Sequence, residues 1–65
     1  MTLTQGELRI LRLLPTHLTL AEIASQLGLS RATVKNHVAA VHRKLQTRTR
    51  AETVRRGKEL GLLPD

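Results

Sequence analysis

The chain has 65 residues, a formal net charge of +6, no cysteine, and no Phe, Tyr or Trp. This length fits a single domain spanning residues 1–65, whose thin core leaves little material for a catalytic cleft. The lack of cysteine excludes disulfides and thiolate metal sites. The longest apolar run is far shorter than the ~18 residues of a membrane span, and no signal-peptide pattern opens the chain. We therefore expect a cytoplasmic protein.

The charge balance points to a polyanion as partner. Eleven Lys and Arg residues stand against five Asp and Glu residues. Such a density of positive charge in a small fold is typical of nucleic-acid-binding domains, although a basic surface can also serve solubility alone. The positions of the charges must distinguish these two interpretations.

Four short patterns predict where helices begin. In three of them a Thr precedes a Glu by three positions, so that the hydroxyl and the carboxylate can each accept a hydrogen bond from a free backbone amide. Ser30 is a fourth N-cap candidate. The three Thr–Glu pairs are Thr4 with Glu7, Thr19 with Glu22, and Thr49 with Glu52.

Apolar spacing then predicts helices over about 5–14, 20–27, 31–45 and 50–60. Pro15 ends the first helix, and Gly28 can close the second in a left-handed conformation. Gly61 stops the fourth, and we expect Leu62 and Leu63 to fold back onto the core. No β-hairpin signal, repeat or low-complexity tract is present. The predicted architecture is all-α, a compact four-helix bundle.

The second and third predicted helices and their three-residue connection fit a helix-turn-helix. The motif needs a small residue where the helices cross, a glycine in the turn and an apolar residue that closes the corner, here Leu29. A generic three-helix bundle with a glycine turn is the alternative. The residues in register with the motif are Ile23, Ala24, Leu27, Gly28, Leu29 and Val34.

A helical wheel separates two faces of the helix predicted over 31–45. Val34, Val38, Val41 and Leu45 point inward. The opposite face interleaves alanines with a few polar residues, as a surface must to fit a groove closely, although it is also compatible with a plain solvated face. Asn can bond adenine twice, Lys and Arg favour guanine, and an Ala methyl can meet a thymine methyl. The candidate base contacts are Lys35, Asn36, Ala39 and Arg43.

The rim of this helix supplies candidate phosphate contacts. Thr19 and Thr33 lie at or near helix N-termini, where free amides favour an anion. Arg48 and Arg50 are equally compatible with solvated loop positions. The full set of predicted phosphate contacts is Thr19, Arg31, Thr33, Lys44, Arg48 and Arg50. Five further cations are interpreted as ordinary surface charge: Arg9, Arg12, Arg55, Arg56 and Lys58.

The three histidines do not predict a metal site or catalysis. His37 lies about 60° from the centre of the apolar stripe, so we expect its ring to be half-buried. His17 and His42 lie five or more positions away from it, and no carboxylate pattern accompanies them. No nucleophile, base and acid occur in a usable set, so we expect neither an enzyme nor a cofactor.

At this level of detail the chain closely resembles the LuxR-type (GerE-type) DNA-binding domain of bacterial transcription regulators. The matching residues extend from Leu3 to about Leu63. They include Ala21-Glu22-Ile23-Ala24, Leu27-Gly28-Leu29-Ser30, Thr33-Val34-Lys35-Asn36-His37-Val38, Arg43-Lys44-Leu45 and Arg50-Ala51-Glu52.

The resemblance implies that the third helix reads the major groove of double-stranded DNA, with Lys35, Asn36 and Ala39 facing the bases. It also implies that the fourth helix pairs two copies on a two-fold operator. We therefore expect a homodimer on DNA, with Thr53, Val54 and Gly57 as candidate dimer contacts. It further implies a position at the C-terminus of a longer regulator. No membrane and no small-molecule ligand are expected as partners of this domain.

Three residues depart from the family pattern. Gly6 replaces a long charged residue and should weaken the first helical turn by ~0.5–1 kcal/mol. Gln46 replaces the usual Gly after the third helix, which leaves the end of that helix uncertain. Gly57 lies inside the fourth helix, where it would either admit a close partner helix or loosen the dimer surface.

Two other functions compete with this interpretation. The promoter-reading helix-turn-helix of a sigma factor shares the Glu-Ile-Ala and Thr-Val-Lys elements, but the Asn36-His37-Val38 run and the capped fourth helix favour the LuxR type. A protein-interaction module could keep the fold and lose the operator, and would then place its important residues on the fourth helix. Nothing in the sequence supports an enzyme.

Overall fold

The computed structural model describes residues 2–65, and this part of the chain contains four α-helices and no strand. The expected helix ranges agree with it to within one residue at each end. Leu14 and Leu60 cap the helices α1 and α4 rather than belonging to them. The helices are α1 (Gln5–Leu13), α2 (Leu20–Leu27), α3 (Arg31–Leu45) and α4 (Arg50–Glu59).

Each helix begins at the predicted hydroxyl side chain. Thr4, Thr19 and Thr49 each accept a hydrogen bond from the backbone amide of the Glu three positions later, and that Glu returns a bond to the cap amide. Ser30 Oγ accepts from the amide of Thr33 at 3.0 Å. Because each cap satisfies amides that the helix itself leaves without partners, the four starts are fixed locally.

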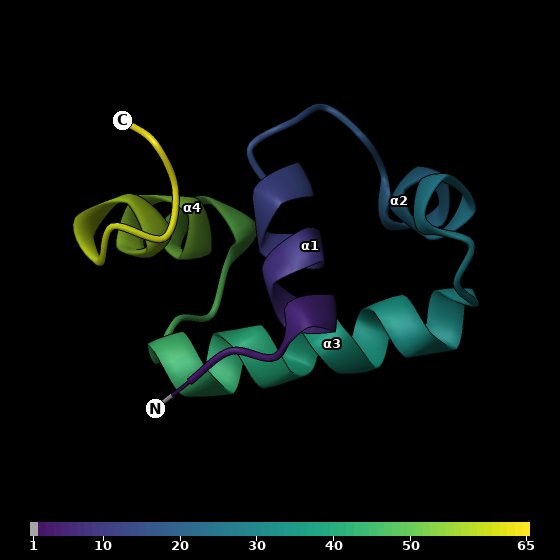
Figure 1. The fold of residues 1–65 in the computed structure, drawn as a ribbon, viewed down its shortest axis with the longest axis horizontal. Coiled ribbons are helices and arrows are strands. Elements are labelled where there is room, and N and C mark those ends of the chain that lie inside the picture. Colours follow the sequence, from purple (N-terminus) through teal and green to yellow (C-terminus); the bar gives the residue numbers. More distant parts are fainter. Residues whose placement is uncertain (1) are drawn as a thin grey trace.

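Helix α3 is the longest helix, and the other three pack against it. In Figure 1 it runs along the lower edge of the molecule, α1 stands across it, and α2 and α4 lie on either side of α1. Helix α3 packs against all three of the others, and α1 also packs against α4. The recognition helix expected from the sequence is therefore held from behind by the rest of the fold.

The core forms where these four helices meet. Leu63 is buried, so the tail folds back onto the core as expected. Leu29, which we expected to close the corner of the turn, is 36% exposed, whereas Ile23, Ala24 and Val34 are buried. The buried apolar residues are Ile10, Leu11, Leu14, Ile23, Ala24, Val34, Val41, Leu45 and Leu63.

Left-handed residues close the ends of two helices and of the turn after α4. Gly28 has φ 69°, and Gly61 has φ 75°. Gln46 adopts the same conformation with φ 58° and caps α3 without being a glycine. The amide of Thr47 then donates to the carbonyl of His42 at 2.9 Å, which closes the helix. The uncertain end of α3 is thus a regular cap built on a strained residue.

Two glycines of the chain are explained by packing within the chain. A Cβ on Gly57 would lie 2.9 Å from Leu63 Cδ1, so Gly57 makes room for the chain's own tail rather than for a partner helix. A Cβ on Gly6 would lie 3.2 Å from His37 Nε2, so Gly6 lets the histidine ring of α3 rest against α1. Both departures from the family pattern therefore shape the interior of this domain.

Candidate nucleic-acid interface

The outer face of α3 presents the four predicted base-contacting residues together. Lys35, Asn36, Ala39 and Arg43 are all exposed. On the opposite side of the helix Val34 and Val41 are fully buried, and Leu45 nearly so. A helix anchored in this way along its length keeps its outer side chains in a fixed relation to one another, as groove recognition requires.

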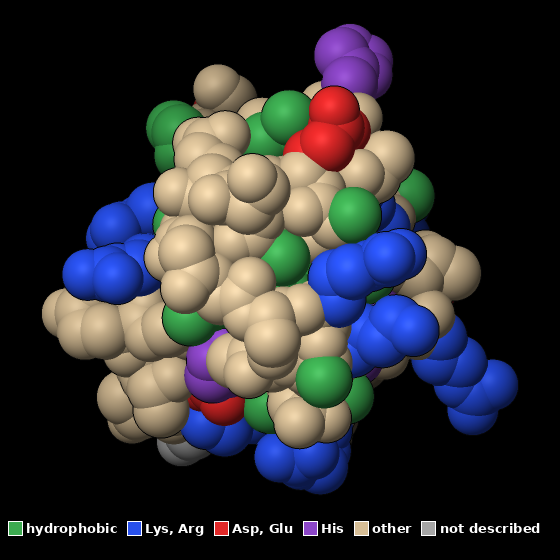
Figure 2. Space-filling view, turned by 90° about the vertical axis from the view of Figure 1, so that its right-hand side faces the viewer, with side chains coloured by type: hydrophobic (Ala, Val, Ile, Leu, Met, Phe, Trp, Pro, Cys, Tyr) green, Lys and Arg blue, Asp and Glu red, His purple; other side chains and the backbone are tan. Residues whose placement is uncertain are grey.

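The charge of α3 is of one sign. It carries Arg31, Lys35, Arg43 and Lys44 and no acidic residue. Figure 2 views the molecule from the side of α2 and the beginning of α3; Lys and Arg side chains show at its lower margin, in its right-hand half and at its left-hand edge, while acidic side chains show as small separate areas. The single sign of the charge on α3 favours a polyanion on that side of the molecule.

The beginning of α3 differs chemically from the other three helix starts. No acidic residue lies in its first turn, whereas α1, α2 and α4 each have a capping Glu there. Ser30 Oγ donates to Thr33 Oγ1 at 2.8 Å, which leaves the Thr33 hydroxyl proton to donate outward. The positive end of the helix dipole is therefore not offset by a carboxylate and can attract a phosphate.

Three more predicted phosphate contacts lie on the surface. Thr19 is exposed and caps α2, with its hydroxyl oxygen accepting from the amide of Glu22 at 3.1 Å. Arg31 and Arg48 are exposed, and within residues 2–65 the structure records no hydrogen bond or ion pair of either guanidinium. All three side chains are thus accessible to a ligand.

Lys44, which we expected to contact a phosphate, is paired within the protein. Its Nζ lies 2.7 Å from Glu7 Oε1 and also donates to the backbone oxygen of Thr2 at 3.1 Å. Only 26% of its side chain is exposed, and 7% of that of Glu7. The sequence put Lys44 near the end of α3, after the candidate base contacts. It did not indicate that the Lys44 side chain extends toward α1.

Arg50 is likewise a structural residue rather than a free cation. Its Nε donates to the carbonyl of Leu14 at 2.8 Å, and its second guanidinium nitrogen, Nη2, donates to that of Thr16 at 2.9 Å. These carbonyls lie at and beyond the C-terminal end of α1, where a helix leaves acceptors without partners. The guanidinium therefore caps α1 from the first residue of α4, and these bonds occupy two of its nitrogens, which argues against the predicted phosphate contact.

Glu7 is the buried charged residue that the sequence analysis missed as an ionic partner. The hydrogen bond from Lys44 lowers the pKa of this carboxyl below its ordinary value of 4.5, and the bond from the Thr4 amide lowers it further. The capping pattern identified Glu7 correctly as a helix start. Its ion pair with Lys44 could not be predicted, because the capping pattern explains the same carboxylate and no further sequence pattern marks its partner on α3.

The three histidines differ in burial and in their contacts. His37 is half-buried against Gly6, as expected, and His17 is exposed. His42 Nε2 is buried and has no hydrogen-bond partner among residues 2–65. Within the same residues no three His, Cys, Asp or Glu side chains gather in a way that could hold a metal ion. No helix in this range is long and apolar enough to cross a membrane.

Comparison with known proteins identifies the class to which this geometry belongs. The family model of the bacterial regulatory proteins of the luxR family, GerE, matches residues 1–56. The chain belongs to the LuxR family. The response regulator RamR of Streptomyces coelicolor is 44% identical to it over 55 residues, which make up 85% of this chain and 27% of RamR. The chain thus spans about a quarter of the length of this relative.

LuxR-family domains of this kind are DNA-binding transcription regulators, so DNA binding in transcription regulation is the general function of this chain. The exposed face of α3 is consistent with this function, because its polar side chains lie opposite the side that is buried in the core.

Two of the three expected dimer contacts of this LuxR-family domain are not on its surface. Thr53 is fully buried, and its hydroxyl donates to the carbonyl of Thr49 at 2.8 Å. Gly57 is buried beneath Leu63. Their spacing of four positions puts these two residues on one face of α4, and that face packs inward. Val54 is half-buried and remains accessible.

Proposed function

We propose that this domain binds duplex DNA sequence-specifically by inserting α3 into the major groove. Lys35, Asn36, Ala39 and Arg43 would face the base edges. The observation that carries the proposal is their common exposure on a helix whose opposite face is buried in the core. A base-reading helix needs both properties, because side chains must reach the bases while the backbone stays in register.

In this proposal the remaining rim contacts bind phosphates. Thr33 and the first amides of α3, which the Ser30 cap does not engage, would hold one phosphate at the helix N-terminus, and Thr19 would donate to a neighbouring one. Arg31 and Arg48 would supply charge. This set is smaller than the sequence suggested, since Lys44 and Arg50 are used within the fold.

Selection of bound duplexes from a random pool tests sequence specificity directly. We expect a consensus from the pool, and in gel-shift assays on it Lys35→Ala and Asn36→Ala should each weaken binding by ~1–3 kcal/mol per lost base contact. Lys58→Ala, which removes an exposed cation from α4, is the matched control and should change specific binding little. A pool that yields no consensus would favour the protein-interaction module.

We further propose that two copies bind a two-fold operator through α4, with Val54 at the contact. Support comes from the accessibility of Val54 and from the family resemblance alone. Sedimentation of the protein on duplexes with one and two half-sites would measure the pairing. Val54→Ala should lower cooperativity between half-sites and leave binding to a single half-site unchanged. Independent filling of both half-sites by the unmodified chain would contradict pairing.

A further inference from the structure

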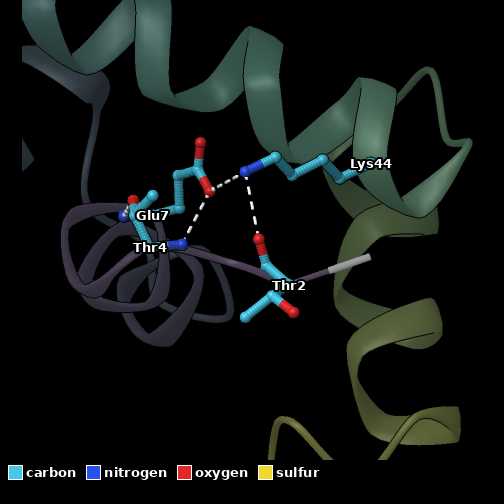
Figure 3. Close-up of polar contacts among 4 residues, drawn as sticks. All are labelled: Thr2, Thr4, Glu7 and Lys44. Atoms are coloured by element: carbon cyan, nitrogen blue, oxygen red, sulfur yellow. Dashed lines mark hydrogen bonds and ion pairs between the residues drawn. The ribbon is translucent and has the colours of Figure 1, made fainter.

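One ammonium group joins the N-terminal arm, residues 2–4, to the end of α3. Lys44 Nζ donates to the backbone oxygen of Thr2 at 3.1 Å and to Glu7 Oε1 at 2.7 Å (Figure 3). The same carboxylate oxygen accepts from the amide of Thr4 at 2.8 Å. The arm, the start of α1 and the end of α3 therefore meet at a single pair of charges.

Burial makes this junction stiff. The Glu7 side chain is almost fully buried, so releasing Lys44 would leave a carboxylate short of a partner where water reaches it poorly. Beside the junction Leu3 packs against the core, and it lines a shallow hollow of about 330 Å³ with Leu8 and Leu45. The arm is thus fixed by a polar contact at Thr2 and an apolar contact at the next residue.

The neighbouring residue shows that the contact belongs to Lys44 alone. Arg43 lies one position earlier on α3 and is exposed, with no ion pair recorded within residues 2–65. A rotation of ~100° per residue along the helix directs the next side chain toward α1. The two adjacent cations therefore point in different directions: Arg43 points to solvent, and Lys44 points to the junction.

We propose that Lys44 is a positioning residue that sets the path along which the chain enters the domain relative to α3. Its ammonium ties the carbonyl of Thr2 to the helix that carries the base-facing residues. Any polypeptide joined to the arm is then oriented by α3, and a force on that polypeptide acts on the end of α3. Lys44 serves this coupling instead of contacting a phosphate.

Backbone NMR relaxation of the 65-residue chain without DNA tests the proposal. In the unmodified protein the amides of Thr2 and Leu3 should be as rigid as those of α1, with order parameters near ~0.85. Lys44→Met keeps the apolar stem and removes the ammonium, and should lower both values below ~0.6 while the four helices remain ordered. Lys44→Arg should restore rigidity, and Lys35→Met is the matched control. An arm that stays rigid in Lys44→Met overturns the proposal.

The salt dependence of binding to a duplex of arbitrary sequence separates positioning from phosphate contact. Lys44→Met should leave the slope of log K against log salt unchanged, whereas Arg48→Ala should reduce it by ~0.9. A reduced slope in Lys44→Met, with a rigid arm, would show a phosphate contact instead. Because the relaxation measurement needs no DNA, its outcome is independent of the proposed base-reading function.

If Lys44→Met does not fold, the unmodified chain decides the question. A hydrogen-bond scalar coupling between Lys44 Nζ and the carbonyl carbon of Thr2 is expected, together with slow exchange of the Lys44 ammonium protons. Lys35 and Lys58 are exposed and provide the reference for rapid exchange. Lys44 protons that exchange as fast as theirs would overturn the proposal.

Discussion

Arg48 and Arg50 are chemically identical and two positions apart, yet their side chains have different surroundings. Arg48 is exposed, and its backbone amide donates to Glu52 Oε1 at 3.0 Å. Arg50 directs its guanidinium to the carbonyls that follow α1. The position of Arg50 as the first residue of α4 explains the difference, because the orientation of that helix aims its side chain at the end of α1.

This difference gives a prediction for the pair. Arg50→Ala should lower the free energy of unfolding by ~1–3 kcal/mol, because it leaves part-buried carbonyls without a charged donor. Urea denaturation followed by circular dichroism would measure the loss. Arg48→Ala is the control and should change stability by less than ~0.5 kcal/mol. Equal effects of the two substitutions would contradict the assignment of Arg50 to the end of α1.

The sequence did not predict which partners the long basic side chains contact. Exposure along α3 follows from helical periodicity, so Lys35, Asn36, Ala39 and Arg43 could be placed in advance. The charged groups of Lys44 and Arg50 bind partners that lie, respectively, 37 and 36 positions earlier in the chain. No local pattern encodes such contacts, because a long flexible side chain can reach either solvent or a neighbouring helix.

At the scale of the helices, prediction succeeded where the signal is local. The hydroxyl caps and their glutamates identified all four starts, since both partners of each hydrogen bond lie within one turn. The apolar stripe identified the buried face of α3, where Val34, Val41 and Leu45 lie in the core. The inward face of α4 was not predicted, because its only strongly apolar residue, Val54, lies beside the buried face rather than at its centre.

The residue that caps the end of α3 should respond to substitution by glycine. Gln46 holds φ 58° without being a glycine, which strains the cap. Gln46→Gly should raise the free energy of unfolding by ~0.5–1 kcal/mol, since glycine adopts this conformation without a steric penalty. Gln26→Gly, at an exposed position with helical backbone in α2, should lower it instead. Thermal unfolding of both variants beside the unmodified chain provides the measurement.

At the scale of the whole molecule, acid should weaken the fold through Glu7. Its pKa is lowered in the folded state, first by the hydrogen bond from Lys44 and then by that from Thr4. A carboxyl with a lowered folded-state pKa contributes stability that is present above its ordinary value of 4.5. That contribution is lost as the pH falls through the folded-state pKa.

Glu7→Gln tests this pH dependence, because glutamine keeps the capping pattern and removes the charge. Near neutral pH the variant should be less stable than the unmodified chain by ~1–3 kcal/mol. Below pH 4.5 the two free-energy curves should converge. Glu22 and Glu52 also have lowered pKa values, through the amides of Thr19 and Arg48, so part of the acid dependence persists in the variant. Parallel curves from pH 7 to pH 3 would contradict the role of the ion pair.

The cap that Arg50 provides for α1 has a consequence for how small this domain can be made. The helix-turn-helix itself occupies residues 20–45, but the helix that covers its inner surface ends in carbonyls whose donor is synthesised 36 positions later. A fragment cut after α3 would expose those carbonyls and also lose Leu63, which belongs to the same buried core as Leu11. We therefore expect α3 to be stably held only when the last segment of the chain packs against the first.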